Sequence, residues 1–176
     1  GGKLFTGILT NTATQNPRSP YRTTFLGNFP KPITSINVAS NDSILTLTFD
    51  DPAGTSVMVN QSDIRKCNNT NVNFVNKSGN LSNRKVYCAL MEKSNYKKVL
   101  IGTDNGVWST SDITAGTPSW QNVNNSLLPN VQVFDIKQQT MNHWECYNSG
   151  QIYVATNGRG VWTNSDFYSP SIVSVE

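Results

Sequence analysis

The sequence has little charge and no sustained helical pattern. Asp, Glu, Lys and Arg make up 14% of its 176 residues, well below the roughly 25% of an average soluble domain. No stretch repeats apolar residues at positions i, i+3, i+4 and i+7, so helix is expected to be nearly absent. No Lys/Arg run exceeds a pair, which gives no support for a nucleic-acid partner. No apolar run approaches the ~20 residues that cross a bilayer, so no membrane span is expected.

Metal-ligating side chains are also scarce. The only histidine is His143, and the three cysteines form no C-x-x-C pair, so a zinc site is not expected. Cys67 and Cys88 could pair as a disulfide across a short loop in an oxidising compartment, which would leave Cys146 free. The alternative is three ordinary thiols, two of them packed in a β core.

The adjacent carboxylates Asp50 and Asp51 precede Pro52 and Gly54. This composition favours a turn. A pair of Ca²⁺ ligands is the alternative interpretation, and no other cofactor is expected.

Strand-like alternation dominates what is present. Residues 44–49 alternate apolar and hydroxylated side chains, and residues 98–103 and 151–156 are rich in β-branched or aromatic types that lead into turns. Such period-two segments predict an all-β chain.

Two segments of the sequence repeat each other closely. Residues 99–108 can be laid on residues 153–162, and both give a strand, a turn, Gly-Val-Trp and then Ser-Asp. Trp162 follows Trp108 by 54 positions, close to the ~40–50 residues of a propeller blade. A weaker copy lies at residues 45–63. Each unit is expected to form four antiparallel strands, as in a blade.

We therefore predict about three four-stranded antiparallel β-propeller blades and a partial one, from the C-terminal part of a larger ring. Closed propellers have at least four blades, so further blades of the same protein or of another chain are expected partners. The predicted units are a partial blade and connector at 1–32, a degenerate blade at 33–81, a blade at 82–130, a last blade at 131–167 and a linker at 168–176.

The repeated positions are interpreted as structural. Gly106 and Gly160 are expected to end turns with positive φ, and Gly102 to mark a close backbone approach. The recurrence of Trp108 and Trp162 favours packing between blades over a sugar-stacking role. The predicted blade motif comprises Gly102, Asp104, Gly106, Trp108, Asn157, Gly158, Gly160 and Trp162.

Residues 102–110 and 157–162 resemble the blades of sialidase- and sortilin-like propellers, which carry Asp-box (BNR-type) repeats. Residues 168–176 resemble the linker of cargo proteins of the bacterial type IX secretion system. Residues 42–44, Asp-Ser-Ile, resemble an O-glycosylation site of the same bacterial groups. These resemblances imply a secreted protein, or one on the extracellular face of the outer membrane.

The sequence offers binding candidates but no catalytic constellation. Trp144 and His143 lie in an unrepeated insertion at 140–146, and Arg159 lies between two glycines of a turn. The leading hypothesis is a non-catalytic module that binds protein or glycan, in a type IX secretion or gliding-associated assembly. The alternatives are a fragment of an exported glycan-active hydrolase whose catalytic residues lie in missing blades, and a sortilin-like sorting propeller.

Overall fold

The computed structural model describes residues 2–9, 21–29, 31–51, 54–62, 72–81 and 83–166. These residues contain thirteen β-strands and no helix. The strands form four antiparallel sheets, numbered I to IV along the chain. Sheet I contains β1 (Gly2–Leu9) and β2 (Tyr21–Phe29). Sheet II contains β3 (Ile33–Val38), β4 (Leu45–Phe49), β5 (Val57–Asn60) and β6 (Phe74–Asn76). Sheet III contains β7 (Val86–Met91), β8 (Val99–Thr103), β9 (Gly106–Thr110) and β10 (Gln121–Asn122). Sheet IV contains β11 (Val133–Gln138), β12 (Ile152–Thr156) and β13 (Val161–Asn164).

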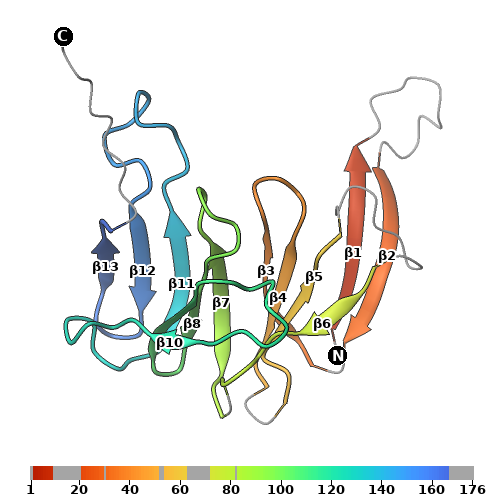
Figure 1. Ribbon diagram of the computed structural model, residues 1–176, viewed down its shortest axis with the longest axis horizontal. Coiled ribbons are helices and arrows are strands. Elements are labelled where there is room, and N and C mark those ends of the chain that lie inside the picture. The colour runs from red at the N-terminus through yellow and green to blue at the C-terminus, as the bar shows by residue number, and fades with distance from the viewer. Residues whose placement is uncertain are drawn as a thin grey trace.

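Each sheet is a simple meander in which consecutive strands pair. The sheets stand in a row in chain order, and the described part of the chain forms no closed ring (Figure 1). Sheet II falls within the predicted unit 33–81, sheet III within 82–130 and sheet IV within 131–167. The prediction of an all-β chain with four-stranded antiparallel sheets is therefore confirmed at sheets II and III, whereas sheets I and IV have two and three strands among the described residues.

Apolar side chains fill the spaces between neighbouring sheets. All five residues of β4 and all five of β8 are buried, because each strand lies in a sheet with neighbours on both faces. Sheets I and II share a cluster of Leu4, Leu26, Phe29, Leu45, Leu47 and Phe49. Sheets II and III share a cluster that includes Ala39, Ile44, Val57, Val59, Val86, Ala89, Met91, Val99, Ile101 and Trp120. Sheets III and IV share a cluster of Cys88, Leu90, Leu100, Val107, Val133, Ile136, Ile152 and Val154.

Polar side chains of β3 cover the backbone edge of β7. In sheet III, β7 is the first strand in the row and has a main-chain partner on one side only. The Thr34 hydroxyl donates to the Val86 carbonyl at 2.9 Å. The Asn37 amide donates to the Ala89 carbonyl at 3.2 Å and accepts from the Met91 N–H at 3.1 Å. Backbone groups that no strand pairs are thereby satisfied by the neighbouring sheet.

The two copies of the repeat form equivalent hairpins. The Thr103 hydroxyl donates to the Gly106 carbonyl at 2.9 Å, and the Thr156 hydroxyl donates to the Gly160 carbonyl at 2.7 Å. Both glycines have positive φ, 88° and 73°, which confirms the prediction made for these turns. Thr156 follows Thr103 by 53 positions and Gly160 follows Gly106 by 54. The β12–β13 turn is therefore one residue longer than the β8–β9 turn.

Candidate functional site

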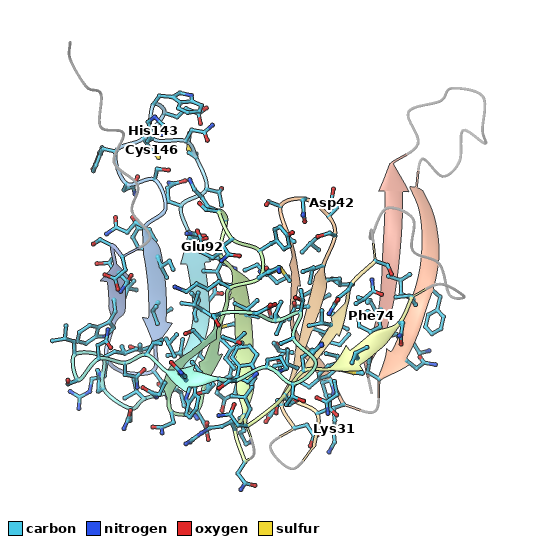
Figure 2. The ribbon with its side chains drawn as sticks, in the orientation of Figure 1. Lys31, Asp42, Phe74, Glu92, His143 and Cys146 are labelled. Carbon is cyan, nitrogen blue, oxygen red and sulfur yellow. The ribbon has the colours of Figure 1, made fainter. Side chains whose placement is uncertain are left out.

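The loop between β11 and β12, residues 139–151, carries the most exposed aromatic side chains among the described residues. Tyr147 is 88% exposed and Trp144 is 72% exposed, and Met141 of the same loop is 49% exposed. His143 and Cys146 lie in the same loop, beyond the ends of the strands (Figure 2). Large apolar side chains gathered on one loop are typical of a contact surface for a partner. We call Met141, Trp144 and Tyr147 the loop patch.

Hydrogen bonds within the loop give it a defined shape. The Asn142 N–H donates to the Glu145 carboxylate at 2.9 Å, and the Glu145 N–H donates back to the Asn142 carbonyl at 2.9 Å. The His143 and Trp144 rings meet edge to face, with centroids 4.7 Å apart at 87°. The segment around Trp144 is thus a hydrogen-bonded turn, and the Trp144 side chain projects from a backbone of defined conformation.

The neighbouring sheet anchors the base of the loop. The Lys93 ammonium, from the loop between β7 and β8, donates to the Ser149 hydroxyl at 2.7 Å and to the Met141 carbonyl at 3.2 Å. The Gln138 amide nitrogen donates to the Glu92 carboxylate at 3.1 Å, and the Gln138 amide oxygen accepts from the Lys93 N–H at 2.8 Å. Glu92 and Ser149 are buried. Residues of both sheet III and sheet IV therefore fix the position of the loop.

Sequence reasoning missed Glu92, Lys93, Gln138 and Ser149. Glu92 and Lys93 follow β7, whereas Gln138 ends β11 and Ser149 lies in the loop after it, and such separate polar residues give no local signal that they meet across a sheet interface.

The predicted binding residues do not form one site. His143 and Trp144 lie together in the β11–β12 loop, whereas Arg159 is exposed in the β12–β13 turn at the opposite end of β12 (Figure 1). Arg159 has a structural role through its backbone, because its carbonyl accepts from the Trp162 indole N–H at 3.0 Å.

The glycines and turn residues of the predicted blade motif lie in hairpins. The N–H of Asp104 donates to the Lys85 carbonyl at 3.2 Å, and the N–H of Asn157 donates to the Gln132 carbonyl at 2.9 Å. The two residues thus occupy the same turn position. Gly158 also has positive φ, 72°.

Gly102 lies where the next sheet approaches most closely. A Cβ atom there would lie 2.7 Å from the Val133 carbonyl oxygen and 2.6 Å from the Cys88 sulfur. The expected close backbone approach is confirmed, since only a glycine leaves room for β11.

The two repeated tryptophans pack between sheets, as predicted. Trp108 packs against the cluster shared by sheets II and III, with the Arg84 guanidinium 5.1 Å from the centre of its ring. Trp162 packs against the cluster shared by sheets III and IV. Each indole leans on the preceding sheet, so neither is a free stacking platform.

The adjacent carboxylates are both paired with lysines. The Asp50 carboxylate lies 3.4 Å from the Lys85 ammonium, and the Asp51 carboxylate lies 4.0 Å from the Lys31 ammonium. Within the described ranges no group of three or more His, Cys, Asp or Glu side chains could hold a metal ion. Calcium at this pair stays a prediction.

Cys88 is a free, buried thiol, and burial raises its pKa to about 12. Cys146 is free and partly exposed. Because Cys88 is free, the structure has the alternative of an ordinary buried thiol there, and the expected disulfide between Cys67 and Cys88 is not formed; Cys67 itself lies outside the described residues.

The fold and the site together define a class: stacked antiparallel sheets that display a structured loop with exposed aromatic side chains. A scan against protein-family models finds no match to this chain, and a search of curated proteins finds none either. In the part of the chain that the structure describes, no helix is long and apolar enough to cross a membrane.

Proposed function

We propose that the four sheets are blades of an Asp-box-type β-propeller of the sialidase- or sortilin-like kind. Consecutive meanders that stack face to face through apolar clusters support this assignment, because a blade buries both faces only against its neighbours. The face of sheet IV that points away from sheet III carries Val161, which is 68% exposed. A further blade, from the same protein or from another chain, would cover that face.

The propeller acts as a non-catalytic interaction module, and the loop patch contacts a protein partner. The observation that carries this function is the exposure of Trp144 and Tyr147 on a loop that Lys93 anchors to the neighbouring sheet. Binding through a loop that is already ordered costs little conformational entropy. Aromatic and Met side chains are also enriched at the centres of protein interfaces.

The module works outside the cell, either secreted or on the extracellular face of the outer membrane. The low charged fraction, 14%, and the polar surface of Ser, Thr and Asn support export. The residues that resemble an O-glycosylation site lie in the turn between β3 and β4, where Asp42 marks the tip (Figure 2). An association with type IX secretion depends on the sequence resemblance.

Photo-crosslinking tests the contact surface. Trp144 is replaced by a benzophenone amino acid in the source cells, and Val75, which is 43% exposed on β6, carries the same probe as the control. We expect a discrete protein adduct from position 144 and none of that mass from position 75. The same adducts at both positions, or none at 144, would contradict the assignment.

A second measurement separates binding from catalysis. With the crosslinked protein purified, the double variant Trp144→Ala/Tyr147→Ala should weaken its binding at least tenfold, or about 1.4 kcal/mol, while Val75→Ala should leave it unchanged. A glycan panel on the intact protein should give no turnover. Robust hydrolysis would refute the non-catalytic function, and glycan binding that depends on Trp144 would replace the protein partner by a glycan.

A further inference from the structure

An apolar groove of about 360 Å³ lies between sheets III and IV, next to β13. Leu100 and Val107 of sheet III form one wall. Ile152, Val154 and Trp162 of sheet IV form the other. Protein interiors are close-packed, so an unfilled apolar space of this size between two stacked sheets calls for an occupant.

The equivalent space between sheets II and III is filled by an aromatic side chain. Trp120 immediately precedes β10, is 1% exposed and donates its indole N–H to the Lys77 carbonyl at 3.0 Å. Sheet II follows the same plan: Phe74 opens β6 and meets the Phe29 ring of sheet I edge to face, with centroids 5.2 Å apart (Figure 2). In both four-stranded sheets, an aromatic side chain at the start of the outermost strand or immediately before it therefore fills the space against the preceding sheet.

Sheet IV has three described strands, and β13 is its outer edge in the part of the chain that the structure describes. Its register nevertheless fixes where a fourth strand would start. In sheet III, Gln121 lies opposite Ser109, so Trp120 comes opposite Thr110. Asn164 is the counterpart of Thr110, because it closes the β12–β13 ladder as Thr110 closes the β8–β9 ladder. The missing side chain should therefore lie opposite Asn164, immediately before a fourth strand whose first residue pairs with Thr163.

The sequence after β13 supplies a match to the outer strand of sheet III. Residues 169–175, Ser-Pro-Ser-Ile-Val-Ser-Val, align with residues 117–123, Thr-Pro-Ser-Trp-Gln-Asn-Val, and the alignment puts Ile172 at the place of Trp120. We propose that residues 167–176, which lie outside the described residues, bind in the groove as the fourth strand of sheet IV. Ile172 then fills the space between the sheets, and the segment is part of the fold rather than the linker expected at 168–176.

A second match supports the same order of segments, with a connection that is two residues shorter in sheet IV than in sheet III. Ser165-Asp166-Phe167 repeats Ser111-Asp112-Ile113 at the start of the connection between the third and fourth strands. Ile113 is fully buried in the cluster shared by sheets II and III. Phe167 therefore brings an apolar side chain to the corresponding place between sheets III and IV.

The connection is long enough, and the groove rim suits an apolar segment. Seven residues separate Asn164 from Ile172, and two suffice to join antiparallel strands. The Asp166 N–H donates to the Asn164 side-chain oxygen at 2.9 Å, so the chain already turns after β13. Leu127, on the rim of the groove, is 78% exposed and would be covered by the docked segment.

Disulfide trapping in the full chain tests the register. Thr163 and Val173 are equivalent to Ser109 and Gln121, which lie directly opposite each other. Opposite residues at a hydrogen-bonded position are about 5.5 Å apart at Cα, within the range of a disulfide. We expect Thr163→Cys/Val173→Cys to form an intrachain disulfide at least tenfold faster than the two-residue shift Thr163→Cys/Ser171→Cys, read by mass spectrometry of the linked peptides. Equal rates would overturn the proposal, and links between chains would assign the groove to a second copy.

Amide exchange tests the docking itself. The Thr163 amide is equivalent to that of Ser109, which faces β10, so the docked segment should protect it. Ile172→Asp should speed exchange at Thr163 at least tenfold. Val173→Asp is the matched control, because neighbouring side chains in a strand point to opposite faces, and it should change the rate less than twofold. An unprotected Thr163 amide in the unmodified protein, or the same response to both variants, would overturn the proposal.

Discussion

Trp120 gives the sharpest test of how the sheets are held together. Its side chain is 1% exposed between sheets II and III, and its indole N–H donates to the Lys77 carbonyl at 3.0 Å. Trp120→Ala should lower the free energy of unfolding by about 3–5 kcal/mol, because it leaves a large cavity. Trp120→Phe keeps most of the apolar volume but leaves the Lys77 carbonyl without its hydrogen-bond donor, so it should lower the free energy of unfolding by about 1–3 kcal/mol.

The matched control uses the same residue type in a different environment. Trp144 is 72% exposed in the β11–β12 loop, so Trp144→Ala should change the free energy of unfolding by no more than about 0.5 kcal/mol. The assay is urea unfolding followed by far-ultraviolet circular dichroism, since removing a tryptophan alters the fluorescence signal itself. A loss below about 1 kcal/mol for Trp120→Ala, or equal losses for both tryptophans, would refute the argument that stacking between sheets stabilises this chain.

Two further predictions follow from the interface between sheets III and IV. Gly102→Ala should cost about 1–3 kcal/mol in the same unfolding assay, because its Cβ would lie 2.7 Å from the Val133 backbone oxygen; a neutral result would mean that β11 can move away. At pH 9 a thiol-alkylating reagent should modify Cys146 in the folded protein and leave Cys88 intact, since burial raises the pKa of Cys88 to about 12. Urea without reductant should then expose Cys88 to the reagent; a Cys88 that stays unmodified would contradict the free thiol.

The sequence was informative wherever a feature repeats. The Gly-Val-Trp copies predicted two equivalent hairpins, and recurrence correctly placed Trp108 and Trp162 between sheets. The ungapped alignment nevertheless hid a one-residue difference, because the extra residue lies in the β12–β13 turn, where loop length varies without disturbing the flanking ladder. The strand pairs therefore correspond at a spacing of 53 up to Thr156 and 54 from Gly160 onward.

The candidate site was predictable only in part. Trp144 stood out because it is an aromatic residue in a polar, unrepeated insertion. The lysine that anchors its loop, Lys93, contributes from another sheet, and such contacts leave no periodic trace in the sequence. The separation of Arg159 from Trp144 could have been predicted from the sequence. The two residues lie in the connections before and after the strand predicted at 151–156, and the two connections of one strand must lie at its opposite ends.

The polar side chains of β3 that cover the edge of β7 bear on aggregation. A bare strand edge recruits other chains by extending its hydrogen-bonded ladder. Asn37 offers Ala89 a donor and Met91 an acceptor, as a peptide group would, but its amide ends a side chain and cannot pass the ladder on. Sheets II and III can therefore stack without fusing into one continuous sheet, and this edge of β7 is withheld as a template for fibrils.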